Sequence, residues 1–174
     1  MERKHIFLIG FMGAGKSTVA AELARQTQRT VIEMDARIER EEQKKISDIF
    51  ADFGEAYFRS LETKLLETIG EEPAAIVSCG GGAAMREENR DIMHVEGYTV
   101  LLTAKPNTIY ERVRFSTERP ILNQNMSVEY IQELMEKRRP AYEAAADFIV
   151  WTDGKNVSQI SQEILEQIEG NSGR

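Results

Sequence analysis

Residues Gly10 to Thr18 read Gly-Phe-Met-Gly-Ala-Gly-Lys-Ser-Thr and match the phosphate-binding pattern G-x-x-x-x-G-K-[ST]. The apolar stretch His5–Ile9 precedes them, and helix-forming sequence follows from Lys16 to about Thr27. A strand, a glycine-rich loop and a helix in this order let backbone N–H groups surround a phosphate at a helix N-terminus, where the helix dipole favours negative charge. This context favours a nucleotide site over a chance glycine-rich turn.

The side chains of the loop predict an ATP site that uses Mg²⁺. Lys16 is expected to reach the β- and γ-phosphates, and the Ser17 hydroxyl is expected to ligate Mg²⁺. The remaining ATP contacts expected from this loop come from Gly13, Ala14, Gly15 and Thr18.

Length and composition restrict the classes of protein that the chain can belong to. Its 174 residues predict one domain over 1–170 with a short disordered tail at 171–174. The net charge of −7 argues against nucleic acid as the main partner, because a phosphate backbone needs a basic face. No apolar segment is long enough for a membrane span. The single cysteine, Cys79, excludes an intrachain disulfide and favours a reducing cytoplasm, where we expect a monomer.

Strand-like and helix-like segments alternate along the chain. The expected strands are His5–Ile9, Thr30–Met34, Ala75–Ser78, Tyr98–Leu102 and Phe148–Trp151. The expected helices are Lys16–Thr27, Ala36–Glu42, Ser47–Phe53, Glu55–Ile69, Glu87–Val95, Pro106–Arg114, Ser127–Arg138 and Val157–Ile168. Strands separated by helices predict an α/β fold of three layers, α/β/α, around a five-stranded parallel sheet of the P-loop kinase type.

Parallel strands place their carboxyl ends at one edge of the sheet, so polar residues that follow different strands should meet there. Asp35 follows the second strand, where it could orient a substrate hydroxyl or accept its proton, or could cap the next helix; the nearby ATP site favours the first reading. The glycines Gly80–Gly82 follow the third strand and are interpreted as backbone lying against a substrate rather than a loose turn.

Three arginines, Arg59, Arg119 and Arg138, are candidates for binding anionic groups of the substrates. Arg59 and Glu62 lie three residues apart on one helical face, although such a pair by itself would usually be a solvated surface pair. Arg119 lies in the irregular stretch 115–126, which we interpret as a lid whose arginine could neutralise charge on the phosphoryl group. Arg138 comes two residues before Pro140, which predicts that the helix ends there.

Several other residues are interpreted as structural. His5 and His94 have no metal-ligating residues at a useful spacing, so no zinc site is expected. Cys79 reads as a small buried residue because nothing nearby offers it a base. Phe50 and Phe58 fit either the core or the apolar wall of an acceptor pocket.

Taken together, these motifs resemble those of the shikimate kinase family. The match covers about residues 6–149 and comprises the phosphate loop, Asp35, Phe58-Arg59 with Glu62, Cys79-Gly-Gly-Gly82, Arg119-Pro-Ile-Leu122 and Arg138-x-Pro-x-Tyr142. The resemblance implies phosphorylation of the shikimate 3-hydroxyl by ATP with Mg²⁺, on the route to aromatic amino acids.

The resemblance also implies roles for single residues. Asp35 would contact the acceptor hydroxyl, Arg59 and Arg138 would bind the shikimate carboxylate, and Gly80, Gly81 and Gly82 would line the substrate. Arg119 would reach the phosphates from the lid, and Arg112 would lie beside the adenine. Paired guanidiniums suit a carboxylate because they bind it through charge-assisted hydrogen bonds.

Two departures from the family pattern leave points open. Many relatives carry Asp-x-Asp after the second strand, whereas this chain has Glu33-Met-Asp35, which leaves open whether Glu33 assists the metal through water. The loop 152–156 lacks the proline that often ends the adenine loop, so its adenine contacts are open as well. A different small-molecule P-loop kinase, such as a gluconate kinase, and a non-catalytic nucleotide-binding module remain the alternatives.

Overall fold

The computed structural model describes residues 4–114 and 127–172. The expected lid at 115–126, with Arg119, lies outside the described residues, as does the end of the expected tail, 173–174.

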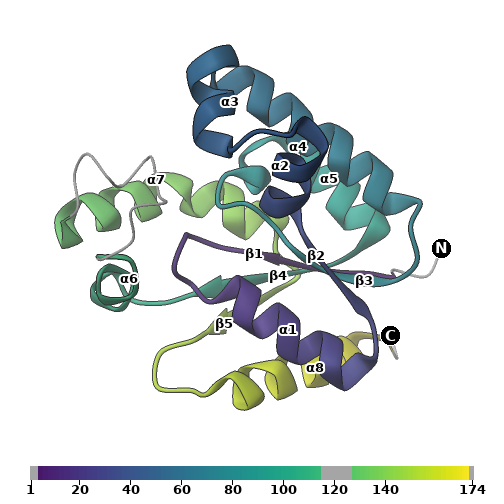
Figure 1. The fold of residues 1–174 in the computed structure, drawn as a ribbon. Helices are drawn as coiled ribbons and strands as arrows, with labels where there is room; N and C mark the ends of the chain where they lie inside the picture. Colours follow the sequence, from purple (N-terminus) through teal and green to yellow (C-terminus); the bar gives the residue numbers. More distant parts are fainter. Residues whose placement is uncertain (1–3, 115–126, 173–174) are drawn as a thin grey trace.

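Five parallel strands form one sheet in the order β2-β3-β1-β4-β5 (Figure 1). They are β1 (His5–Ile9), β2 (Thr30–Glu33), β3 (Ala75–Ser78), β4 (Gly97–Thr103) and β5 (Phe148–Trp151). The predicted five-stranded parallel sheet is therefore confirmed, with β1 and its phosphate loop at the centre. The second strand ends one residue earlier than expected because Met34 already belongs to the following helix.

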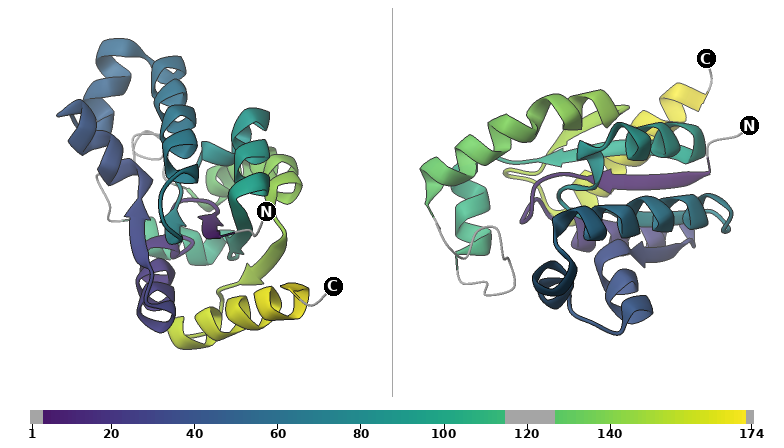
Figure 2. Two further views of the ribbon diagram at one scale, coloured as in Figure 1. Left: turned by 90° about the vertical axis from the view of Figure 1, so that its right-hand side faces the viewer. Right: turned by 90° about the horizontal axis from the view of Figure 1, so that it is seen from above.

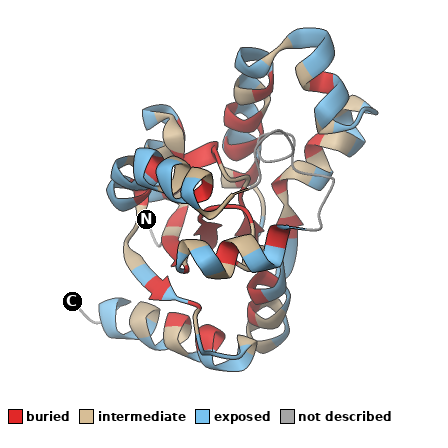
Figure 3. Ribbon diagram, turned by 90° about the vertical axis from the view of Figure 1, so that its left-hand side faces the viewer, coloured by how far each residue is buried: buried red, intermediate tan, exposed pale blue. Residues whose placement is uncertain are grey.

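Side chains alternate along β1 and so build a core on each face of the sheet. Ile6 and Leu8 pack with α1 (Lys16–Thr27) and α8 (Val157–Ser172). Phe7 and Ile9 pack on the other face with α4 (Glu55–Gly70), α5 (Glu87–Glu96) and the end of α7 (Val128–Ala145). Figure 2 shows these helices on either side of the sheet, and Figure 3 shows buried residues along the strands and on helix faces that turn toward them. The three-layer prediction is confirmed.

Shorter helices lie around the carboxyl edge of the sheet, toward which all five strands run. They are α2 (Met34–Glu42), α3 (Ile46–Phe53), the 3₁₀ turn η1 (Ala83–Met85) and α6 (Pro106–Val113). The helices α2 and α3 pack on α4 (Figure 1). Among the described residues, no helix combines the length and apolar character that crossing a bilayer requires.

The expected end of the seventh helix before Pro140 is wrong. Helix α7 continues through Pro140 to Ala145 and buries Tyr142 and Ala145. Proline inside a helix removes one backbone hydrogen bond, and here the burial of the last turn outweighs that loss.

The last helix is also longer than expected, since α8 extends beyond Ile168 to Ser172. Its start is as expected, because Asn156 and Gln159 exchange two hydrogen bonds of 2.9 Å as a capping box. The Ser127 hydroxyl likewise caps α7 by accepting a hydrogen bond from the Tyr130 amide.

Candidate active site

The phosphate loop lies between β1 and α1, against the end of β4. Gly10 has a φ of 148°, and a Cβ there would lie only 2.3 Å from the Leu102 carbonyl oxygen. Glycine is therefore required at this position. Lys16 reaches back across the loop and donates hydrogen bonds to the carbonyls of Gly10 (2.6 Å) and Phe11 (3.2 Å).

The first turn of α1 contains no acidic residue, so no carboxylate of the helix itself offsets the positive end of its dipole. The side chains of Ser17 and Thr18 are exposed in that turn. Gly13, Ala14 and Gly15 form the preceding part of the loop. The loop thus presents a helix N-terminus, a lysine and an exposed hydroxyl together, as the sequence motif predicts.

Asp35 lies in the first turn of α2, directly past the end of β2. The N-cap of that helix is Glu33, which makes no side-chain capping bond, so the alternative that Asp35 is the cap is wrong. A Cβ on Gly80 would lie 2.9 Å from Oδ1 of Asp35, which places the carboxylate against the glycine turn.

Several charged groups affect the pKa of the buried Cys79 thiol at the end of β3. Burial raises the pKa of its thiol, Lys16 opposes that shift, and the carboxylates of Glu33 and Asp35 add to it. A Cβ on Gly81 would lie 3.8 Å from the Met12 amide nitrogen and 3.9 Å from the Gly10 carbonyl oxygen, so the glycines after β3 also lie against the phosphate loop. The predicted convergence of the loops after β1, β2 and β3 is present in the structure, and Cys79 is the small buried residue that we expected.

The three glycines after β3 face four different charged side chains. Gly80 lies beside both Asp35 and Glu62, because a Cβ there would come within 3.0 Å of Oε2 of Glu62 as well. A Cβ on Gly81 would lie 3.2 Å from Nη1 of Arg138. A Cβ on Gly82 would lie 2.5 Å from both terminal nitrogens of Arg59. The turn therefore separates two guanidiniums and approaches each of them more closely than a side chain would allow.

Arg59 is held by a buried carboxylate. Its Nη1 donates to Oε1 of Glu62 at 2.6 Å, and Glu62 is 0% exposed, so the alternative of a solvated surface pair is wrong. Burial raises the pKa of Glu62, while the neighbouring charge of Arg59 opposes that shift. The guanidinium also lies over the ring of Phe58, 5.3 Å from its centroid. Glu62 thus fixes the direction in which Arg59 points.

Arg138 is a buried cation with unused hydrogen-bonding capacity. It is 8% exposed, and its buried Nη1 has no hydrogen-bond partner among the described residues. Its guanidinium lies 5.6 Å from the centroid of the Phe11 ring. A buried charged donor without a partner destabilises the fold, so this position suits an anionic ligand.

Arg112 ties the outer side of the phosphate loop to the loop after β5. Its Nη1 donates to the Gly13 carbonyl at 2.9 Å and to the Thr152 hydroxyl at 3.2 Å. Asp153 in the same loop accepts hydrogen bonds from the Lys105 amide and the Thr108 hydroxyl. These contacts place Arg112 next to the phosphate loop, on the side of α6.

Sequence reasoning missed three residues of this site. Phe11 lies inside the phosphate motif and escaped notice because its position there accepts any residue. Tyr142 was visible in the Arg-x-Pro-x-Tyr motif but received no role, although its hydroxyl donates to the Gly81 carbonyl. Asn89 gave no local signal, because its partners Thr63 and Ala83 come from other elements.

The fold and the site define an ATP-dependent small-molecule kinase of the P-loop class. Residues 12–169 match the family model described as shikimate kinase. The shikimate kinase of Persephonella marina is 42% identical over 165 residues, which are 95% of this chain and 99% of that protein. The shikimate kinase of Dehalococcoides mccartyi is 38% identical over 174 residues, 98% of each chain. The chain belongs to the shikimate kinase family.

Solved structures agree with this assignment. The shikimate kinase from Acinetobacter baumannii in complex with shikimate superposes with a TM-score of 0.91 at 31% identity, covering 97% of this chain and 94% of that one. The shikimate kinase from Aquifex aeolicus gives a TM-score of 0.84 at 36% identity, covering 97% and 98%. A gluconokinase from Sinorhizobium meliloti gives 0.60 at 16% identity, covering 96% and 92%, and that likeness extends to the fold alone.

Proposed function

We propose that this protein transfers the γ-phosphoryl group of ATP to the 3-hydroxyl of shikimate, giving shikimate 3-phosphate and ADP. The observation that carries the proposal is the grouping of Asp35, Arg59 and Arg138 around one glycine turn at the sheet edge that also holds the phosphate loop. Shikimate is a small polyol with a single carboxylate. The two arginines suit its carboxylate, and the carboxylate of Asp35 suits one of its hydroxyls.

The acceptor is held by the two arginines. Its carboxylate lies between Arg59, oriented by Glu62, and the unused Nη1 of Arg138. The glycines Gly80–Gly82 line the ring, since their missing side chains leave room for close approach. The acceptor's 3-hydroxyl then faces Asp35, while its carboxylate lies on the arginine side of the same turn.

The chemical step is an in-line displacement at the γ-phosphorus. The hydroxyl oxygen of shikimate forms the new bond to phosphorus, the bond from the γ-phosphorus to the β–γ bridging oxygen breaks, and ADP leaves with that electron pair. Asp35 orients the hydroxyl and accepts its proton. Lys16 exchanges its contacts with the Gly10 and Phe11 carbonyls for the β- and γ-phosphates, where it offsets the negative charge.

The residues at the loop fit a magnesium ion bound with ATP. The described residues contain no group of three or more His, Cys, Asp or Glu side chains that could cage a metal. Mg²⁺ needs no such cage, since it commonly takes one or two protein oxygens, substrate phosphates and water. The exposed hydroxyl of Ser17 would hold it, and Glu33 would contact it through water. When bound there, the ion would supply positive charge that offsets the charge of the phosphates.

Further contacts complete the proposed ATP site. Backbone groups from Gly13 to Thr18 would surround the phosphates, and Arg112, which donates to the Gly13 carbonyl, would lie along the adenine. Arg119 would approach the transferring group from the stretch 115–126. We also propose that the protein works as a monomer in the cytoplasm, which light scattering after gel filtration and cell fractionation would test.

The test is a coupled ADP-release assay with shikimate, with gluconate and without an acceptor. We expect turnover with shikimate alone; turnover with gluconate would favour the other kinase, and ADP release without an acceptor or no release at all would contradict the proposal. Arg59→Ala and Arg138→Ala should each raise the KM for shikimate about tenfold to a hundredfold, because each removes a charge-assisted contact. Arg25→Ala, on an exposed pair with Glu22, is the matched control.

A further inference from the structure

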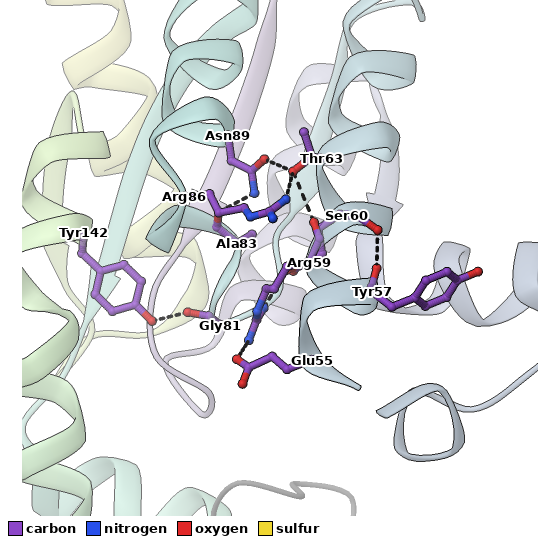
Figure 4. A network of polar contacts seen from close by, with 11 residues as sticks. Glu55, Tyr57, Arg59, Ser60, Thr63, Gly81, Ala83, Arg86, Asn89 and Tyr142 are labelled. Atoms are coloured by element: carbon purple, nitrogen blue, oxygen red, sulfur yellow. Dashed lines mark hydrogen bonds and ion pairs between the residues drawn. The ribbon is translucent and has the colours of Figure 1, made fainter. Parts of the chain in front are cut away.

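Each of the two arginines of the site is followed, one helical turn later, by a residue with a hydroxyl group. Four residues after Arg138 on α7 comes Tyr142, and four residues after Arg59 on α4 comes Thr63. Residues four apart lie on the same face of a helix, so each hydroxyl lies on the same side of its helix as the arginine. The Tyr142 hydroxyl is hydrogen-bonded directly to Gly81 of the glycine turn (Figure 4). The Thr63 hydroxyl is linked through Asn89 to Ala83, the residue that follows the turn.

On the α7 side the connection is direct. The Tyr142 hydroxyl donates to the Gly81 carbonyl, and the tyrosine side chain is almost entirely buried against the sheet. Gly81 is also the glycine that faces Nη1 of Arg138. One hydrogen bond therefore fixes the turn at the point where it meets the first guanidinium.

On the α4 side the connection runs through Asn89 of α5. The Thr63 hydroxyl lies 2.7 Å from Oδ1 of Asn89, and Nδ2 of the same amide donates to the Ala83 carbonyl at 2.8 Å. Asn89 is 0% exposed. Ala83 follows Gly82, the glycine that faces Arg59. The second anchor thus fixes the turn next to the second guanidinium.

We infer that Tyr142 and the Thr63–Asn89 pair are positioning residues that set the separation of Arg138 and Arg59 across the glycine turn. The inference rests on the proposed function, in which both arginines take one carboxylate. Neither anchor contacts the phosphate loop in any hydrogen bond of the described residues. They should therefore affect recognition of the carboxylate and leave recognition of ATP unchanged.

Conservative variants test this inference. Tyr142→Phe keeps the buried ring and removes only the hydroxyl, and Thr63→Val removes a hydroxyl at nearly constant volume. Each should raise the KM for shikimate about fivefold, as expected for one neutral hydrogen bond, with the KM for ATP unchanged and kcat within twofold. Thr63→Ser, which restores the hydroxyl, should return the KM for shikimate to the wild-type value.

The control is Tyr98→Phe, which removes a hydroxyl that contacts Ser172 near the start of β4, at the opposite edge of the sheet. It should leave both KM values unchanged. Calorimetric titration of shikimate without nucleotide provides a second measurement that does not depend on turnover, and circular dichroism establishes that each variant is folded.

The outcomes separate the inference from the function on which it rests. If Arg59→Ala and Arg138→Ala weaken shikimate binding while Tyr142→Phe and Thr63→Val do not, the positioning role is wrong and the proposed site stands. If the anchor variants raise both KM values equally, or if Thr63→Ser behaves like Thr63→Val, the anchors are merely structural. If the wild-type protein does not phosphorylate shikimate, the proposed function itself fails.

Discussion

Gly82→Ala adds one methyl group at the point where the glycine turn meets Arg59. Gly82 has φ and ψ of −104° and 1°, which an L-residue can adopt, so the backbone itself accepts alanine. The new Cβ would lie 2.5 Å from both terminal nitrogens of Arg59, whereas nonbonded heavy atoms prefer about 3.5 Å or more. The guanidinium must therefore retreat by roughly 1 Å.

The displacement of Arg59 should weaken the binding of shikimate and leave the binding of ATP unchanged. Losing one charge-assisted hydrogen bond is worth about 1.5–3 kcal/mol, which corresponds to roughly a tenfold to hundredfold rise in the KM for shikimate. The KM for ATP should stay within twofold, because Arg59 lies on the acceptor side of the turn. The obstructing atoms belong to a guanidinium that buried Glu62 holds, so the free energy of unfolding should fall as well, and circular dichroism establishes that Gly82→Ala is folded.

Initial rates from coupled ADP release, with each substrate varied in turn, measure both KM values. Gly70→Ala is the matched control, since a Cβ there meets the side chain of Glu96 at 3.0 Å, at the opposite edge of the sheet. Gly81→Ala should give a smaller rise than Gly82→Ala, because its Cβ would lie 3.2 Å from Arg138. An unchanged KM for shikimate in folded Gly82→Ala, or an equal rise in both KM values, would refute the placement of Arg59 in the acceptor site.

Lys16→Ala should lower kcat about a hundredfold or more because it removes a cation from the developing negative charge, and near-normal turnover would contradict the loop assignment. Asp35→Asn should lower kcat by about 10²–10⁴ while the KM for ATP changes little; an unchanged kcat would leave Asp35 without a role in proton transfer. Burial lowers the pKa of His5, so the unfolded chain binds a proton that the folded chain does not, and the free energy of unfolding should fall as pH drops below about 6.5. Urea unfolding at pH 7.5 and 5.5 measures this fall, and the same pH dependence in His5→Asn would show that another group is responsible.

The fold could be predicted because its signals are local. Each strand is a short apolar run, each run is followed by helical sequence, and the phosphate loop fixes where the first strand ends. Because parallel strands end at one edge of the sheet, the order of the elements alone places Asp35 and the glycine turn at that edge. The loop and Asp35 were therefore accessible from the residues themselves, whereas the roles expected for Arg59 and Arg138 came from the family resemblance.

The parts that could not be predicted depend on contacts between distant segments. Helix α7 continues through Pro140 because its last turn is buried against the sheet. The sequence around Pro140 does not by itself indicate that burial. Glu62 lies on a helix that could equally have been solvated, and only the packing of α4 shows that it is 0% exposed. Asn89 is joined to Thr63 across 26 residues, and nothing in its own neighbourhood sets it apart.

The charges at the site explain how a chain with a net charge of −7 can hold an anionic substrate. Arg59 is balanced by buried Glu62 before any ligand binds, whereas Arg138 keeps a buried nitrogen without a hydrogen-bond partner among the described residues. The fold keeps this unsatisfied donor in place by burying Tyr142 one turn away and by packing the guanidinium against Phe11. Such a donor lowers the stability of the empty protein, and a carboxylate that satisfies it stabilises the folded state by mass action. In the proposed site, the same nitrogen would favour an acid over a neutral polyol, because the polyol would leave it unsatisfied.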